Sequence, residues 1–144
     1  MKLNQRPATE ADIPFLFALR RATMDAHLRA AGADTSDRYH RERLMYKFEW
    51  ANILVLDSES VGLLKVVKEP PIWEIVQIQL VEKLQGRGIG GFLLQQVIAE
   101  AATAKCDTRL SVLKSSPAKR LYESLGFVVV GEDEHEYFMH RAAA

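Results

Sequence analysis

Four glycines stand close together in the segment LQGRGIGGFLL, residues 84–94, and no other segment constrains the fold of this chain as strongly. An extended apolar stretch at 72–81 precedes it, and a stretch with helical periodicity at about 88–104 follows. The sequence therefore predicts a strand, a glycine-rich turn and a helix in direct succession. Such a turn either packs the helix tightly on the strand or binds an anion.

Two glycine patterns overlap in this segment. The dinucleotide-binding pattern G-x-G-x-x-G is formed by Gly86, Gly88 and Gly91, and the pattern Q-x-x-G-x-G is formed by Gln85, Gly88 and Gly90. A dinucleotide-binding loop normally follows the first strand of its fold, with an acidic residue after the next strand. Here the loop follows the fourth expected strand, and Asp107 precedes the next strand. The context therefore disfavours a dinucleotide site.

A purely structural turn needs only one or two glycines, whereas this loop has more. Successive small residues leave backbone N–H groups accessible to a ligand, and the start of the following helix adds a partial positive charge. Arg87 contributes a full positive charge within the loop. An anion site is therefore the favoured hypothesis, with the structural turn as its alternative.

The remaining patterns predict one α/β domain over residues 1–144, with about seven strands and about four helices in the order β-α-α-β-β-β-α-β-α-β-β. The expected strands are 2–6, 52–56, 61–67, 72–81, 109–113, 127–130 and 135–139. The expected helices run from Thr9 or Asp12 to Gly32, over 36–50, over 88–104, and from Ser116 to Gly126. Their predicted buried residues are Ile13, Phe17, Met24 and Leu28, then Leu44, Met45 and Phe48, then Phe92, Leu93, Val97 and Ala101.

Composition excludes several classes of partner. Lys plus Arg and Asp plus Glu both number 19, so we expect no nucleic-acid partner. The single Cys106 cannot form an internal disulfide, and no metal site is expected. The longest uncharged stretch, 88–99, is shorter than the roughly 18 residues typical of a membrane span. Because Glu10 and Asp12 also argue against a secretory leader, we expect a cytoplasmic protein without a membrane partner.

Two segments together resemble the GNAT superfamily of N-acetyltransferases. Residues 85–90, QGRGIG, resemble its Q/R-x-x-G-x-G/A signature, whose loop holds the pyrophosphate of coenzyme A. Residues 116–127, SPAKRLYESLGF, are similar to its N-x-x-A-x-x-L-Y-x-x-x-G-F segment, with Ser116 in place of the usual Asn. The resemblance implies a largely antiparallel GNAT-like sheet, acetyl-CoA as cofactor, and transfer of an acetyl group to a primary amine by direct attack in a ternary complex.

The resemblance also implies roles for individual residues. Tyr122 would donate a proton to the departing thiolate, since a phenol of pKa near 10 can donate to a thiolate of pKa about 8.5. The Ile78 N–H would bind the acetyl oxygen where the fourth strand bulges away from the fifth, and Glu74 would act as the base, directly or through water. The implied cofactor-binding residues are Ile78, Gln79, Leu80, Gln85, Gly86, Arg87, Gly88, Ile89, Gly90, Ser116, Lys119 and Tyr122. The candidates for acceptor binding are His27, Trp73 and His135.

Each assignment has an ordinary alternative. Tyr122 fits a packing residue on an amphipathic helix, Glu74 a solvated carboxylate at a strand end, and Gln79 a partner for polar groups in the core. The alternative function is a non-catalytic acyl-CoA-binding sensor or scaffold. The sequence does not determine whether the acceptor is a small-molecule amine or a peptide amine, and it leaves pairing into a homodimer open.

Overall fold

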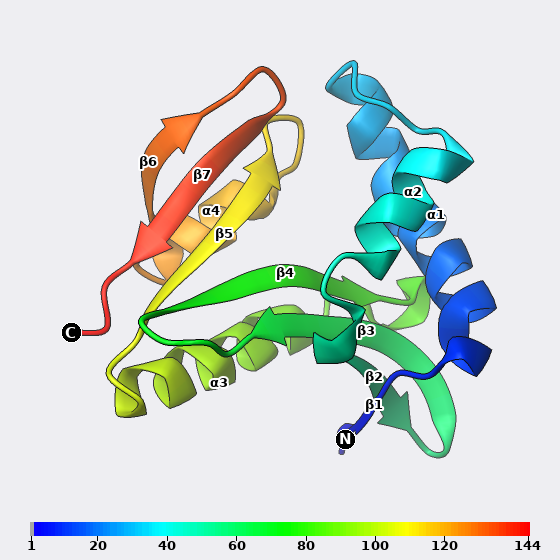
Figure 1. Cartoon of the computed structure of the whole chain (residues 1–144), viewed down its shortest axis with the longest axis horizontal. Helices are drawn as coiled ribbons and strands as arrows, with labels where there is room; N and C mark the ends of the chain where they lie inside the picture. Colours follow the sequence, from blue (N-terminus) through cyan, green and yellow to red (C-terminus); the bar gives the residue numbers. More distant parts are fainter. Residues whose placement is uncertain (1) are drawn as a thin grey trace.

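The computed structural model describes residues 2–144, and the strands of this part of the chain form one seven-stranded sheet (Figure 1). The strands are β1 (Asn4–Pro7), β2 (Ala51–Leu56), β3 (Glu59–Val67), β4 (Ile72–Leu80), β5 (Asp107–Leu113), β6 (Val128–Glu132) and β7 (Glu136–Arg141). The α-helices are α1 (Ile13–Ala30), α2 (Asp37–Met45), α3 (Ile89–Thr103) and α4 (Ala118–Ser124). Short 3-10 helices are η1 (Glu10–Asp12), η2 (Phe48–Trp50) and η3 (Glu82–Leu84). The predicted α/β class and element order are confirmed.

The sheet opens in its middle. Its strand order is β1-β2-β3-β4-β5-β7-β6, and neighbouring strands are antiparallel except for β4 and β5, which are parallel. The pairing of β4 with β5 begins at Ile72 with Asp107 and ends at Glu74 with Arg109. Beyond Glu74 the two strands separate, so that the sheet forms a V in Figure 1. One edge of β4 from residue 75 onward therefore has no strand beside it in the described chain.

A β-bulge at the start of this open edge changes the face of the sheet to which the side chains of β4 point. Lys65 pairs with Gln77 and Val66 pairs with Ile75, so Val76 is the extra residue of the bulge. Ile75 before the bulge and Leu80 after it both belong to the core on the α3 side. Gln77 lies on the opposite face, where its Nε2 donates a hydrogen bond to Arg43 O at 3.5 Å.

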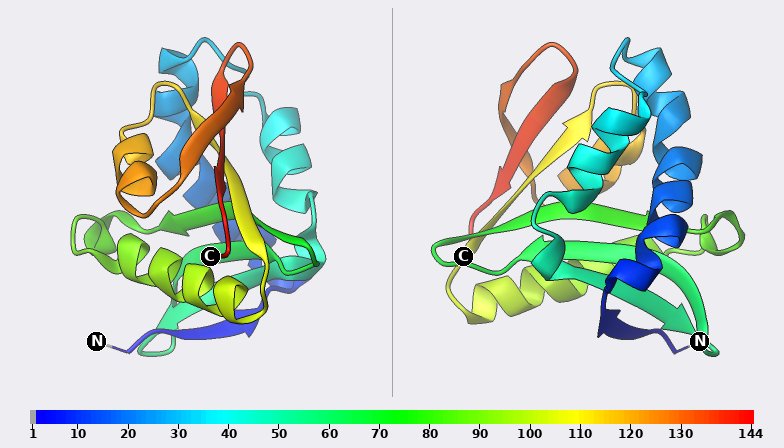
Figure 2. Two further views of the ribbon diagram at one scale, coloured as in Figure 1. Left: turned by 90° about the vertical axis from the view of Figure 1, so that its left-hand side faces the viewer. Right: turned by 45° about the vertical axis from the view of Figure 1, so that its right-hand side comes forward.

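The helices cover both faces of the sheet (Figure 2). The buried face of α3 packs on one side through Leu93, Leu94, Val97, Ile98 and Ala101. Partly buried residues of α4, including Tyr122, join the same core. A second core on the other side joins α1 and α2 to β2 and β3, and it consists of Leu16, Leu19, Leu44, Ala51, Ile53 and Leu63.

The structure corrects the predicted buried face of α1. Ile13, Phe17 and Met24 are only partly buried, and of the predicted residues Leu28 alone is buried. The buried residues are Leu16, Leu19, Arg20 and Leu28. Apolar periodicity did not identify this face, because it counts a charged residue such as Arg20 as exposed.

The end of α2 and the buried face of α3 also differ in part from the prediction. The second helix ends at Met45, which is 46% exposed, and Lys47 has a left-handed φ of 53° that prevents continuation to residue 50. The third helix buries Leu93, Val97 and Ala101 as predicted, but Phe92 is 58% exposed. The start of α3 at Ile89 places Leu93, Leu94, Val97 and Ile98 on the sheet side, which turns Phe92 toward solvent.

Gly62 in β3 is required by close packing against β4. An added Cβ at Gly62 would lie 2.5 Å from the backbone oxygen of Gln79. We therefore expect Gly62→Ala to lower the free energy of unfolding by about 2 kcal/mol, measured by urea denaturation. Gly131→Ala is the control, because the added Cβ would lie 3.4 Å from Phe138 Cδ2. An equal loss of unfolding free energy in the two variants would contradict the close packing of β3 and β4.

Candidate active site

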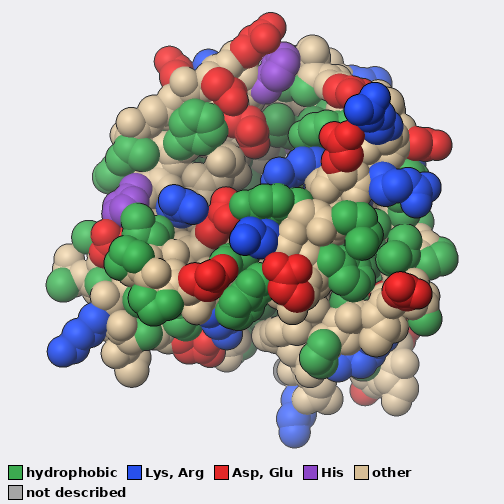
Figure 3. Space-filling view, in the orientation of Figure 1, with side chains coloured by type: hydrophobic (Ala, Val, Ile, Leu, Met, Phe, Trp, Pro, Cys, Tyr) green, Lys and Arg blue, Asp and Glu red, His purple; other side chains and the backbone are tan. Residues whose placement is uncertain are grey.

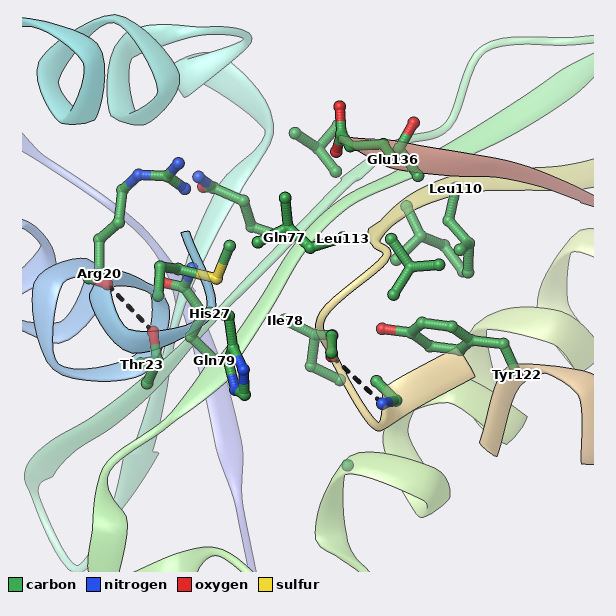
Figure 4. A pocket seen from close by; sticks show the side chains of 18 of the residues that line it. Arg20, Thr23, His27, Gln77, Ile78, Gln79, Leu110, Leu113, Tyr122 and Glu136 are labelled. Carbon is green, nitrogen blue, oxygen red and sulfur yellow. Dashed lines mark hydrogen bonds between the residues drawn. The ribbon is translucent and has the colours of Figure 1, made fainter. Parts of the chain in front are cut away.

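A cavity of about 490 Å³ lies where β4 and β5 separate (Figure 4). Its wall combines residues from α1, α2, β4, α3, β5, α4 and β7 with the glycine loop. The predicted site residues on this wall are His27, Glu74, Ile78, Gln79, Leu80, Gln85, Gly90, Ser116 and Tyr122. The fold thus brings together residues from both motifs and from β4, the strand with the open edge.

The glycine loop continues from this wall through Gly86, Arg87, Gly88 and Ile89. Gly86 and Gly88 have left-handed φ angles of 75° and 76°, and Gly88 is the N-cap of α3. Within residues 2–144, the N–H groups of residues 86–91 donate no hydrogen bond, and the next amide, Phe92 N–H, donates to Gly88 O at 3.1 Å. Consecutive free amides at a helix start, beside Arg87, fit the diphosphate of a nucleotide-like cofactor.

Gln85 connects this loop to the end of β4. Its Nε2 donates a hydrogen bond to Leu80 O at 2.9 Å, whereas Val81 N–H donates to Val61 O of β3 at 2.9 Å. The peptide groups of successive residues in a strand point to opposite edges. The peptide groups of Leu80 and, two residues earlier, Ile78 therefore point away from β3. The Ile78 N–H faces the open edge of β4.

Tyr122 faces the same cavity from α4. Figure 4 shows its hydroxyl pointing toward the space between Ile78 and Leu113. Its ring packs edge-to-face with Phe127 at a centroid distance of 6.1 Å, and burial raises the pKa of Tyr122. The hydroxyl has no hydrogen-bond partner among residues 2–144, so it carries a proton that is free to be donated into the cavity.

Ser116 also lies on the cavity wall, and its hydroxyl supports the start of α4. Its Oγ accepts a hydrogen bond from Ala118 N–H at 3.2 Å. Pro117, not Ser116, occupies the N-cap position of the helix. The hydroxyl in place of the usual Asn amide is therefore already engaged as an acceptor.

Three predicted residues are placed elsewhere. Trp73 is buried in the core on the α3 side, because it precedes the bulge, and Lys68 Nζ lies 5.3 Å from its ring centroid. Lys119 Nζ lies 4.7 Å from the ring centroid of Tyr137 and 3.9 Å from a Glu123 carboxylate oxygen. His135 makes a structural contact at the end of the cavity instead of lining it.

Two hydrogen bonds join the end of α1 to the other half of the sheet. Ser115 Oγ donates to His27 O at 2.6 Å, and His135 Nδ1 donates to Ala31 O at 2.9 Å. Figure 1 shows the α1–α2 loop and the β6–β7 loop at the same end of the molecule. These bonds link α1 to the half of the sheet that contains β5 and β7.

Several charged wall residues have no counterpart among the residues predicted from sequence. They are Arg20, Arg43 and Glu136, which lie with Tyr39 and Gln77 on the wall beside α1, α2 and β7. Burial raises the pKa of Glu136, and the charge of Asp133 raises it further. The sequence could have indicated that Arg20 is buried, because Arg20 lies beside Leu16 and Leu19 on one face of α1. Acidic and basic side chains are interspersed on the face shown in Figure 3.

Glu74, the predicted base, lies at the point where β4 leaves β5. Its Oε1 accepts a hydrogen bond from the Tyr46 hydroxyl at 3.1 Å. The carboxylate therefore has a fixed position on the cavity wall.

Within residues 2–144, no group of three or more His, Cys, Asp or Glu side chains could hold a metal ion. No helix in this range is both long and apolar enough to cross a membrane.

The chain belongs to the acetyltransferase (GNAT) domain family, whose model matches residues 25–138. This membership confirms the family suggested by the two motifs, the acetyltransferase class and acetyl-CoA as the cofactor. No curated protein matches the chain.

Solved structures show the same fold at low sequence identity. PaiA N-acetyltransferase from Thermoplasma acidophilum, in complex with coenzyme A, is 17% identical with a TM-score of 0.74, over 99% of each chain. The ribosomal-protein-S18-alanine N-acetyltransferase from Escherichia coli is 16% identical with a TM-score of 0.72, over 99% of this chain and 95% of the other. N-acetylglutamate synthase from Neisseria gonorrhoeae, complexed with coenzyme A and N-acetyl-glutamate, is 23% identical with a TM-score of 0.69, over 100% of this chain and 36% of the other.

Proposed function

We propose that residues 1–144 form one N-acetyltransferase domain that moves an acetyl group from acetyl-CoA to a primary amine by direct attack in a ternary complex. The observation that carries this proposal is the open edge of β4. The Ile78 N–H faces that edge, the Tyr122 hydroxyl points into the same cavity, and free amides of the glycine loop continue from it. The similar structures are named for a ribosomal-protein alanine and for N-acetylglutamate, so the fold alone does not select the acceptor.

The chain's own groups fit acetyl-CoA at this edge. The amides of residues 86–91 and the start of α3 would hold the diphosphate, with Arg87 adding positive charge. Gln79 and Leu80 would line the pantetheine arm along the edge of β4, where its amides could hydrogen-bond as a neighbouring strand does. When bound, acetyl-CoA supplies an acetyl thioester, the activated form of the group to be transferred.

Each protein group then has one task in the transfer. The Ile78 N–H would donate to the acetyl oxygen, where negative charge develops during the transfer. Tyr122 would donate its proton to the departing sulfur, and the raised pKa keeps this proton in place beforehand. Glu74 would receive the proton lost by the amine, directly or through water.

The importance of the base depends on the acceptor. At pH 7, neutralising an α-amine of pKa about 7.8 costs about 1 kcal/mol, and a lysine amine of pKa about 10.4 costs about 4.6 kcal/mol. Loss of Glu74 would therefore matter more for a lysine side chain than for an α-amine. The half-buried Glu136 lies on the same wall and is a second carboxylate within the acceptor region.

We expect Tyr122→Phe to lower kcat about 100-fold, because the departing sulfur loses its proton donor. The affinity for acetyl-CoA should change little, since the ring still packs on Phe127. The measurement is thiol release from acetyl-CoA with a panel of amines, together with calorimetric binding of the cofactor. Tyr137→Phe is the control, because the Tyr137 ring contacts Lys114 and Lys119 outside the cavity wall.

Two outcomes would oppose this assignment. An unchanged kcat in Tyr122→Phe would remove Tyr122 from the chemistry. Binding of acetyl-CoA without thiol release on any amine would favour a non-catalytic acyl-CoA sensor or scaffold.

A further inference from the structure

Arg20 is a buried cation on the part of the cavity wall that α1, α2 and β7 form. It is 3% exposed, and its Nε donates a hydrogen bond to His40 Nδ1 at 2.9 Å. His40 Nε2 in turn donates to Asp25 Oδ1 at 2.6 Å. This chain of hydrogen bonds fixes the guanidinium, and Figure 4 shows it pointing toward the end of Gln77.

The guanidinium of Arg20 forms no ion pair within 4.0 Å of a described carboxylate; its carbon lies 5.5 Å from the ring centroid of Tyr39, and the nearest acidic partner, Asp25, is reached through His40. The next residue of the helix differs, since Arg21 pairs through Nη1 with Asp25 and through Nη2 with Asp37. A buried charge without a counter-ion is unfavourable, so such a site gains free energy when an anion binds. The planar guanidinium suits a carboxylate, which can accept two parallel hydrogen bonds from it.

A second arginine extends this positive wall. Arg43 also lines the cavity, and its guanidinium carbon lies 5.2 Å from the ring centroid of Tyr46. It forms no ion pair with any described residue. Burial lowers the pKa of Arg20, and the nearby charge of Arg43 lowers it further, so the two cations repel each other across this wall. An anion between them would relieve that repulsion.

Two carboxylates lie on other parts of the same wall. Glu74 belongs to β4 and Glu136 to β7, and neither forms an ion pair within 4.0 Å with Arg20 or Arg43. Burial and the charge of Asp133 raise the pKa of Glu136, and the charges of Arg43 and Arg20 offset this rise in part without direct contact. The cavity therefore presents separate positive and negative groups to one occupant. A molecule with an amine and a carboxylate matches both.

We propose that the acceptor is a small amine that also carries a carboxylate, as an α-amino acid does. Arg20 and Arg43 bind its carboxylate, and its amine lies toward Ile78 between Glu74 and Glu136. This inference rests on the proposed N-acetyltransferase function, because it names the acceptor class of the same site.

The test compares L-amino acids with their carboxamides, which keep the amine and side chain but lack the carboxylate. The carboxamide amine loses its proton more readily, so intrinsic reactivity at neutral pH favours the carboxamide. For the best acceptor, we expect wild type to show a kcat/KM about 100-fold higher for the acid than for the carboxamide. Arg20→Gln should remove this preference through a raised KM for the acid, and Arg21→Gln should keep it.

Cofactor affinity and circular dichroism check that each variant is folded. Should Arg20→Gln fail to fold, Arg43→Gln decides, since Arg43 does not contact the His40–Asp25 pair, and we expect it to reduce the preference about 10-fold. Carboxamides acetylated as well as acids, or an unchanged preference in the folded Arg20→Gln or Arg43→Gln variant, would overturn the inference and leave the proposed function intact. Failure to acetylate any amine would instead contradict the proposed function.

Discussion

The substitution Gly90→Glu should weaken acetyl-CoA binding about 1000-fold while leaving the fold intact. Gly90 is the second residue of α3 and lies on the cavity wall, and an added Cβ would meet nothing within 4 Å. A carboxylate there would lie beside the free amides proposed to hold the diphosphate. Two like charges about 4 Å apart repel by about 4 kcal/mol at an effective dielectric constant of about 20, which gives this magnitude.

The same change should not lower stability. Glutamate in the first turn interacts favourably with the helix dipole, and glycine is a poor residue within a helix. Calorimetric titration with acetyl-CoA and thermal unfolding of the free protein measure the two effects separately. Gln95→Glu provides the control, because it adds the same charge at an exposed position of α3. If both variants bound acetyl-CoA equally well, the diphosphate would lie elsewhere and the assignment of the glycine loop would be lost.

The glycine loop was predictable because its determinants are local. Left-handed φ angles at Gly86 and Gly88, the helix start at Ile89 and the preceding strand all follow from residues close together in the sequence. The end of α4 followed from the same principle, since Gly126, with a φ of 97°, comes directly after the C-cap residue Leu125. Local backbone preferences thus placed the turns on which the cofactor assignment depends.

The part of the cavity wall beside α1, α2 and β7 was not predictable in the same way, because contacts between residues distant in the sequence form it. Arg20 meets His40 across the α1–α2 interface, and Glu136 reaches the cavity from the last strand. The extra residue Val76 shifts β4 by one position, which separates Trp73 from Gln77 although strict alternation would put them on one face. Apolar periodicity does not give the position of such a bulge, and the structure places Trp73, an expected acceptor-binding residue, in the core.

Replacing Lys65 by Met should lower the free energy of unfolding by about 4 kcal/mol, because it leaves several buried carbonyls without a donor. Lys65 is 0% exposed, and its Nζ donates to Arg43 O, Leu44 O and Tyr46 O at 3.3, 2.9 and 2.6 Å. These oxygens lie at the end of α2, the helix that brings Tyr39 and Arg43 to the cavity. Lys68→Met is the control and should cost less than about 1 kcal/mol, since Lys68 makes a surface ion pair with Glu100.

The effect of Lys65→Met should also depend on pH. Burial, together with the charges of Arg43 and Arg20, lowers the pKa of Lys65 to about 7 in the folded chain. An unfolded lysine has a pKa of about 10.4, so between these values the unfolded chain binds more protons and the stability of the wild type rises with pH. Urea unfolding should therefore show the difference between wild type and Lys65→Met growing by about 2 kcal/mol from pH 7 to pH 9. A constant difference would mean that the carbonyls at the end of α2 hold Lys65 as an ammonium ion throughout this range.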